Sequence, residues 1–328
     1  MLYIHDTTDI RIGEPTAVSI GKFDGFHRGH RYLISNLKKI ADENGLKTLI
    51  FTFGTSPLHF ISGKAEKLLC TKKERQLLSR NCGADYYIEY PFTDEVRKIP
   101  AGVFLKDILH DRLMVRHIVA GPDCRFGYKG EGDVEFLMEY ASKLGMDFTI
   151  VAKKKFHGEV ISSTRIRHCL IEGQVEQANS MLGYNYGMTG RVVHGNGIGG
   201  VEFGFPTINQ EAPVCKRLPK SGVYLARIVL EEGVYYGMSN VGRKPTIASG
   251  LPVGVETYVF GYSGDLYEQR VRVEFLKFIR PERRFDTHDE LRRQLVKDKE
   301  MAEALIRNKG FVEYAADEYF TEKDMAAL

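Results

Sequence analysis

The chain has 328 residues, enough for two domains, and its 43% hydrophobic and 27% charged residues are typical of a soluble globular protein. A net charge of only +3, from 46 basic and 43 acidic side chains, gives no general attraction to nucleic acid or to a membrane surface. Five scattered cysteines without a C-x-x-C pair, no signal-peptide pattern and no apolar run of ~20 residues predict a cytoplasmic protein without a disulfide framework or structural zinc.

Strand-like and helix-like segments alternate through the first half of the chain. Their lengths predict crossover connections and therefore a parallel sheet. The expected strands are 17–20, 47–53, 86–89, 117–120 and 148–152. The expected helices are one that contains the apolar positions 33, 34, 37 and 40, and those at 72–80, 103–109 and 134–144.

A glycine-rich segment, Gly21–His30, lies between the first of these strands and a helix, where an open α/β sheet places its ligands. The start of a helix offers unpaired N–H groups and a positive dipole end, which suit phosphate. His27 and His30 are three residues apart and share a helix face, and Gly25 and Gly29 let backbone approach a ligand. A lone H-x-G-H motif would favour two surface histidines at a helix start, and the flanking strand, glycines and helix shift the interpretation toward a phosphate site.

A second segment suited to phosphate is ISSTRIR, from Ile161 to Arg167. Its hydroxyl side chains, on Ser162, Ser163 and Thr164, suit helix capping, and two arginines follow at the start of a predicted helix. The alternative is a capped helix with a solvated basic face.

The hydrophobic period changes to two after about residue 190, which predicts an antiparallel β domain, a small closed barrel. The strands are expected at 223–230, 234–238, 255–260 and 271–279, and a terminal helix at about 287–308. We place the boundary between two domains, 1–185 and 186–328, at this change of period.

A glycine loop opens the second domain with Gly195, Gly197 and Gly199. It formally contains G-x-G-x-x-G, but no helical pattern follows, so a dinucleotide fold is not expected. Such a loop can still cover a triphosphate with backbone N–H groups, or be a plain β-turn. Shortly after it, Thr207 and Asn209 fall on one face of an extended segment, and their two oxygens suit Mg²⁺ held together with ATP phosphates.

Together, G-x-F-D-G-x-H-x-G-H and I-S-S-T-x-I-R resemble the HxGH nucleotidyltransferases, and in this form their FMN adenylyltransferase branch. Asp123-Cys124-Arg125-Phe126-Gly127 resembles a flavin-binding segment of that branch. The resemblance implies that FMN attacks the α-phosphorus of ATP and releases pyrophosphate. It implies triphosphate contacts for His27 and His30, phosphate contacts for Ser163, Thr164 and Arg167, and flavin contacts for Asp123, Arg125 and Phe126.

The second half resembles the riboflavin kinase domain. The resemblance rests on an ordered series: G-F-P-T-x-N at 204–209, G-V-Y at 222–224, S-N-V-G-R-K-P-T at 239–246, Val255-Glu256, G-D-L-Y at 264–267 and R-P-E at 280–282. It implies a Greek-key barrel and a kinase that takes riboflavin and ATP with Mg²⁺. The family's catalytic carboxylate falls on Glu256, as general base, whereas a glutamate here is otherwise an exposed strand residue.

The whole chain therefore resembles the bifunctional riboflavin kinase/FMN adenylyltransferases, which bind small molecules and make FMN and then FAD. Two departures keep alternatives open. Thr55 and Ser56 stand where the branch carries proline and histidine, and the loop at 199–203 lacks the family's arginine. The alternatives are a kinase with a weak or inactive adenylyltransferase half and a flavin-sensing regulator without turnover. An oligomer is possible but not predicted.

Overall fold

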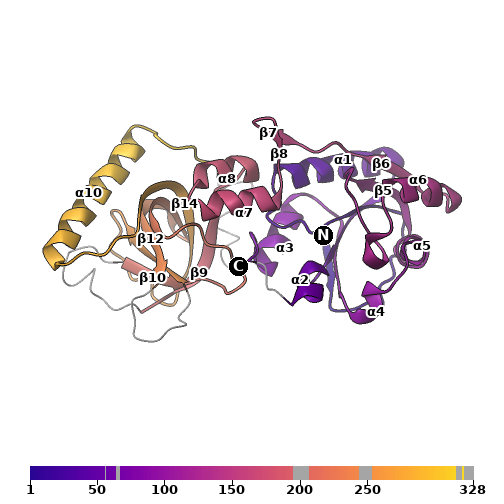
Figure 1. Ribbon diagram of the computed structural model, residues 1–328, viewed down its shortest axis with the longest axis horizontal. Coiled ribbons are helices and arrows are strands. Elements are labelled where there is room, and N and C mark those ends of the chain that lie inside the picture. The colour runs from indigo at the N-terminus through magenta and orange to yellow at the C-terminus, as the bar shows by residue number, and fades with distance from the viewer. Residues whose placement is uncertain (56, 64–66, 195–206, 244–252, 315–319, 321–328) are drawn as a thin grey trace. The chain divides into compact units, whose positions relative to one another are not determined.

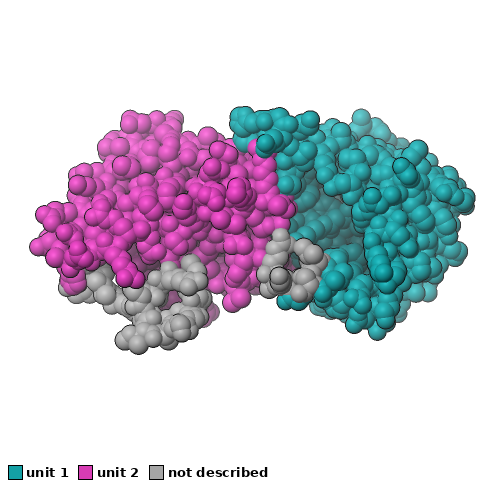
Figure 2. Space-filling model, viewed as in Figure 1, with its two compact units in different colours: residues 1–66, 75–162 teal, residues 67–74, 163–328 magenta. Residues whose placement is uncertain are grey.

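The computed structural model describes residues 1–55, 57–63, 67–194, 207–243, 253–314 and 320. The glycines of the second-domain loop, at 195, 197 and 199, and Ser56 lie outside these residues. The chain forms two compact units (Figures 1 and 2). The first contains residues 1–66 and 75–162, and the second contains residues 67–74 and 163–328. The expected boundary of functional domains, at 185/186, remains a prediction, because a compact unit and a functional domain need not end at the same residue.

The first unit is built on a six-stranded parallel sheet, as its alternating pattern predicts. In spatial order the strands are β1 (Leu2–His5), β4 (Tyr86–Tyr90), β3 (Lys47–Phe53), β2 (Thr16–Ile20), β5 (Val115–Ala120) and β6 (Asp147–Ile150). β2 and β3 are buried along most of their length, as is typical of a parallel sheet whose two faces are both covered.

Helices connect these strands. They are α1 (Arg28–Asn44), α2 (Pro57–Ser62), α3 (Lys72–Asn81), α4 (Asp94–Arg97), α5 (Ala101–Val103), the π-helix η1 (Phe104–Arg112), the 3₁₀ turn η2 (Tyr128–Gly130) and α6 (Val134–Lys143). α1 packs on β2, β3 and β5, and its apolar stripe buries Ile34, Leu37 and Ala41. A short hairpin, β7 (Lys155–Phe156) and β8 (Glu159–Val160), closes the unit.

The second unit is a closed antiparallel barrel with helices outside it. Around the barrel the strands are β10 (Thr207–Glu211), β13 (Val253–Val259), β12 (Gly233–Arg243), β11 (Gly222–Leu230), β14 (Arg270–Pro281) and β9 (Gly187–Val193). β11, β12 and β13 form a meander and β14 returns beside β11, which is the Greek-key order expected from the sequence. The helices are α7 (Ser163–Ile171), α8 (Val175–Leu182) and α10 (His288–Arg307).

The terminal helix α10 begins where the sequence predicts. The hydroxyl of Thr287 accepts a hydrogen bond from the backbone N–H of Glu290, and Asp289 and Glu290 complement the helix dipole. Leu291 and Leu295 pack against Val223 and Met238 on the outer face of the barrel. This packing fixes the helix over β11 and β12.

Candidate functional sites

The topology of the first sheet places two predicted segments at one point. The chain runs from β2 through β3 to β4 in one direction, and β5 lies on the other side of β2, so the strand order reverses between β2 and β5. Ligands of open α/β sheets bind at the carboxyl ends of the strands at such a reversal. Gly21–His30 follows β2, and the segment with Asp123 and Arg125 follows β5.

The two histidines form a stacked pair at the start of α1. His27 is the N-cap, and its Nδ1 accepts a hydrogen bond of 3.2 Å from the backbone N–H of His30. The ring centroids lie 3.6 Å apart with an angle of 16° between the planes. Because Nδ1 of His27 is the acceptor, its ring proton is assigned to Nε2, which is left to donate to a ligand.

The loop before the pair is held in an uncommon backbone conformation. Phe23, Gly25 and Phe26 all have positive φ, at 46°, 83° and 37°. Such conformations at non-glycine residues cost on the order of 1–3 kcal/mol each and gather at functional sites. The rings of Phe23 and Phe26 are fully buried and contact His30 edge-on, with centroids 5.3 and 6.5 Å away. This packing fixes the position of the imidazole pair.

Gly29 has a different immediate role from the one predicted. A Cβ at this position would lie 3.1 Å from Nδ1 of His27 and 3.2 Å from Cε1. The missing side chain therefore makes room for the capping imidazole. Direct approach of this backbone to a ligand remains a prediction.

Both imidazoles are neutral at neutral pH. Burial, and then the charge of Arg31, lower the pKa of His27 to about 3. Burial, followed by His27 and Arg31, lowers the pKa of His30 well below its usual value. The pair can therefore offer ring N–H donors to phosphate oxygens, but not two full positive charges.

The ISSTRIR segment begins a helix, as expected. α7 starts at Ser163, and Arg167 Nη2 donates to the hydroxyl of Thr164 at 3.4 Å. Ser162 ends the first compact unit, whereas Ser163, Thr164 and Arg167 belong to the second. Their phosphate contacts remain a prediction.

The predicted flavin segment has partners within its own unit. Asp123 pairs with Lys153, and Arg125 Nη1 lies 2.8 Å from an Oδ of Asp133, the N-cap of α6. The ring of Phe126 packs partly buried against Phe104 and Phe136, with centroids 6.1 and 6.0 Å away. Asp123 and Arg125 are exposed and accessible to a ligand, whereas the Phe126 ring is already partly covered by Phe104 and Phe136.

In the second unit, three predicted residues meet on the outer face of the barrel. Asn209 lies directly opposite Glu256 in the β10–β13 ladder. Thr207, two residues before Asn209 and on the same face, donates its hydroxyl proton to Oε1 of Glu256 at 2.7 Å. Glu256 is exposed and Asn209 is buried, with 7% of its surface accessible. The arrangement combines a carboxylate with two neutral oxygen ligands.

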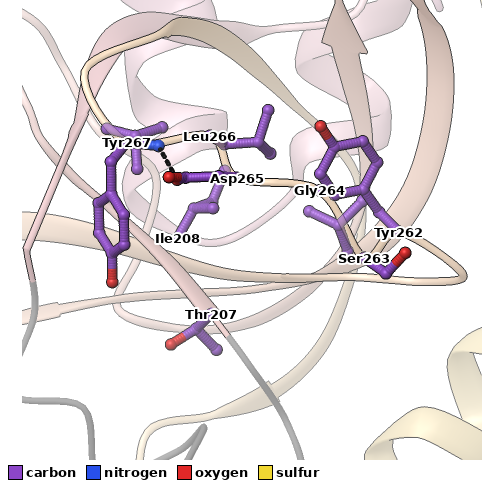
Figure 3. A pocket seen from close by; sticks show the side chains of 10 residues that line it. Thr207, Ile208, Tyr262, Ser263, Gly264, Asp265, Leu266 and Tyr267 are labelled. Carbon is purple, nitrogen blue, oxygen red and sulfur yellow. Dashed lines mark hydrogen bonds between the residues drawn. The ribbon is translucent and has the colours of Figure 1, made fainter.

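A cavity of about 170 Å³ opens beside Thr207 (Figure 3). The loop between β13 and β14 forms most of its wall, with Tyr262 and Tyr267 at opposite ends of the segment that is drawn. Asp265 holds this loop by accepting a hydrogen bond of 2.9 Å from the backbone N–H of Tyr267. His194, at the end of β9, stacks on the Tyr267 ring with centroids 4.0 Å apart. Sequence reasoning assigned these residues no role, although Gly264–Tyr267 carries part of the kinase resemblance.

Two further features bear on the predictions. Thr55 is described and exposed. Within the described part of the chain, no helix is long and apolar enough to cross a membrane, and no group of three or more His, Cys, Asp or Glu side chains could hold a metal ion.

Comparison with known proteins gives a consistent result. Residues 9–165 match the family model of FAD synthetase, and residues 182–306 match that of riboflavin kinase. The chain is 34% identical to the bifunctional riboflavin kinase/FMN adenylyltransferase of Escherichia coli K12, over 87% of this chain and 91% of that protein. It is 32% identical to the protein of the same name from Listeria monocytogenes, over 93% and 98% of the two chains.

A solved structure shares the whole architecture. A Streptococcus pneumoniae chain described as a macrolide-efflux protein superposes with a TM-score of 0.84 at 28% identity. The match covers 92% of this chain and 99% of that one.

Proposed function

The chain belongs to the family of bifunctional riboflavin kinases and FMN adenylyltransferases, and from this premise we propose which residues carry out each of its two reactions. The enzyme transfers the γ-phosphoryl group of ATP to riboflavin, giving FMN. It then transfers the adenylyl group of a second ATP to FMN, giving FAD and pyrophosphate. The observation that carries the assignment of the kinase site is the hydrogen bond of 2.7 Å between Thr207 and Glu256, with Asn209 opposite the carboxylate.

For the kinase reaction, Glu256 is the general base. Its Oε1 accepts the Thr207 hydroxyl, which orients the carboxylate and leaves Oε2 for the terminal hydroxyl of the ribityl chain. As that oxygen forms a bond to the γ-phosphorus, its proton passes to Glu256 and the bond to the β-phosphate oxygen breaks. An exposed carboxylate is accessible to such a substrate.

The residues beside Glu256 fit a magnesium ion. Because the Thr207 hydroxyl donates a hydrogen bond to Glu256, the lone pairs of its oxygen remain available to a cation. Asn209 adds an amide oxygen on the same face, and Mg²⁺ binds well to a few such oxygens together with nucleotide phosphates. When bound, the ion neutralises charge on the transferring phosphate. We assign it to Thr207 and Asn209.

The cavity beside Thr207 suits the base of ATP. Two tyrosines and the apolar side chains of Val192, Ile208 and Leu266 line a space of about 170 Å³, which fits a planar heterocycle. A base there places the phosphates of the nucleotide toward Thr207. The loop of Gly195, Gly197 and Gly199 lies outside the described residues, and from its sequence alone we assign it to bind those phosphates through backbone N–H groups.

For the adenylyltransferase reaction, the imidazole pair holds the triphosphate. His27 donates through Nε2–H, and His30 donates from the next turn to charge that develops on the α-phosphate oxygens. A phosphate oxygen of FMN attacks the α-phosphorus and pyrophosphate leaves, without a covalent enzyme intermediate. Backbone near Gly25 and Gly29 binds phosphate oxygens, and Asp123, Arg125 and Phe126 bind the flavin. We assign phosphate contacts to Ser162, Ser163, Thr164 and Arg167 from the sequence motif that they form.

The test is product analysis of two variants. Purified protein stripped of flavin is given riboflavin, ATP and Mg²⁺, and flavins are separated by chromatography. Glu256→Gln should make no FMN from riboflavin but still convert added FMN to FAD. His27→Ala/His30→Ala should stop at FMN. FAD from the histidine variant, or FMN from Glu256→Gln, would refute the corresponding assignment.

A further inference from the structure

The outer face of the barrel carries a polar row that continues beyond the residues assigned so far. Glu256 on β13 lies opposite Asn209 on β10 on one side and opposite Asn240 on β12 on the other. Residues directly opposite in antiparallel strands point to the same face with Cβ atoms about 5 Å apart. Asn240 therefore flanks Glu256 directly, on the side opposite to Asn209.

The side chain of Asn240 is available to a ligand. It is partly buried, and its amide makes no hydrogen bond with any residue that the structure describes. Two residues further along β12, Gly242 has no side chain, and the carboxylate of Glu282 fills the space: its Oε1 lies 2.5 Å from where a Cβ would be. The amide of Asn240 thus lies between two carboxylates on one face.

The two flanks of Glu256 differ chemically. On one flank, Thr207 and Asn209 offer neutral oxygens to the cation and phosphates of ATP. The attacking oxygen must lie between the base and the γ-phosphorus, in line with the leaving oxygen. The rest of the acceptor molecule therefore extends away from the phosphates, over the flank where Asn240 lies. Beyond Asn240 the row ends at Val223, which packs with Leu291 and Leu295 of α10.

We propose that Asn240 binds the acceptor substrate by hydrogen bonds to secondary hydroxyl groups of its chain, with Glu282 accepting from a hydroxyl further along. An amide that can donate and accept, followed by a carboxylate that only accepts, matches a polyol. This inference rests on the proposed kinase site and deepens it: the site selects a hydroxylated chain, and Asn240 sets that selectivity.

The test crosses one substitution with one substrate change. The kinase reaction is measured for wild type and Asn240→Ala with riboflavin and with a flavin carrying a 5-hydroxypentyl chain, which keeps the terminal hydroxyl and lacks the three secondary ones. With riboflavin, Asn240→Ala should lower kcat/KM by roughly 3- to 10-fold, which corresponds to the loss of about one hydrogen bond. The loss should come from a higher KM for the flavin, and KM for ATP should be unchanged. With the hydroxypentyl flavin, wild type and variant should react equally.

Controls separate this role from a structural one. Asn240→Ser, which keeps a hydrogen-bonding group, should recover part of the riboflavin activity, and Asn308→Ala, a remote asparagine of the same unit, should behave as wild type. An equal loss with both flavins, or no loss with riboflavin, would overturn the role of Asn240 while the kinase site stands. A wild type that phosphorylates neither flavin, or a fully active Glu256→Gln, would overturn the kinase site itself.

Discussion

At the scale of single residues, we propose that Thr207 serves two partners with one hydroxyl: it donates to Glu256, and its lone pairs bind the cation. Thr207→Val removes both interactions with little change of volume. We expect kcat of the kinase to fall by at least ~10-fold, and Thr207→Ser to keep most of it. Steady-state kinetics with riboflavin and ATP measure the effect. Equal activity of the valine and serine variants would show that the hydroxyl has no such role.

The buried imidazole of His27 predicts a pH dependence of stability. Its pKa is about 3 in the folded protein against an ordinary 6.5, so between these values only the unfolded chain binds the proton. The stabilisation is complete above pH 6.5 and is lost as the pH falls, at up to about 1.4 kcal/mol per pH unit. His27→Asn keeps a capping oxygen without a titratable ring. The free energy of unfolding of this variant, from denaturant titrations between pH 7 and 5, should fall less steeply with decreasing pH than that of wild type. Equal slopes would contradict the burial of a neutral His27.

From the sequence we could propose roles for single residues but not their contacts. The resemblance to riboflavin kinases, and not spacing alone, assigned phosphate transfer to Thr207, Asn209 and Glu256. The bond between Thr207 and Glu256 joins residues 49 positions apart and depends on strand register, which a single sequence does not specify. For the same reason, the proximity of Asn240 to Glu256 was not predictable.

At the scale of elements, the missing side chain of Gly29 makes room for the ring of His27, which caps the start of α1. Gly29→Ala favours the helix intrinsically but brings a Cβ to within 3.1 Å of the His27 ring. We expect slower FAD formation from FMN, an unchanged kinase and little change in thermal stability. Gly13→Ala is the matched control, because a Cβ there meets nothing within 4 Å. Wild-type FAD formation in Gly29→Ala would show that the imidazole pair tolerates displacement.

A buried charge network joins the segment 67–74 to the barrel within the second unit. Glu74 lies 2.6 Å from Lys216 Nζ and 3.3 Å from Arg272 Nη1, and all three are at most 5% exposed. Both cations keep the pKa of Glu74 below its usual value despite the opposing effect of burial.

Neutralising Glu74 removes the carboxylate charge that pairs with the buried side chains of Lys216 and Arg272. We expect Glu74→Gln to lower the free energy of local opening of β14 by about 3–5 kcal/mol. Amide hydrogen exchange of the β14 residues measures this free energy. Glu303→Gln, on the solvated face of α10, should change it little, because its pairs with Lys299 and Arg307 are exposed. Similar small effects of both substitutions would mean that the network contributes no net stability.

Hydrophobic periodicity predicted the long elements and missed the short or exposed ones. β2, β3 and the barrel meander follow from apolar runs and period-two alternation. β1, with four residues at the edge of the sheet, and the separate β7–β8 hairpin, with two residues in each strand, were missed because so few residues carry little pattern. The helix expected from residue 103 exists, but as the π-helix η1, which buries Phe104, Leu105, Ile108 and Leu109.

At the scale of the whole molecule, the proposed assignments place the two reactions in different units with different chemistry. The imidazole pair belongs to the first unit, and the Thr207–Glu256 pair belongs to the second. FMN, the product of one site, is the substrate of the other, so loss of one site should not prevent the other from working on supplied flavin.

The most direct measurement mixes Glu256→Gln with His27→Ala/His30→Ala and supplies riboflavin, ATP and Mg²⁺. Each variant alone should make no FAD from riboflavin. The mixture should make it, because FMN released by the histidine variant reaches the intact adenylyltransferase site of the other chain. FAD from either variant alone, or none from the mixture, would contradict the assignment of one reaction to each pair of residues.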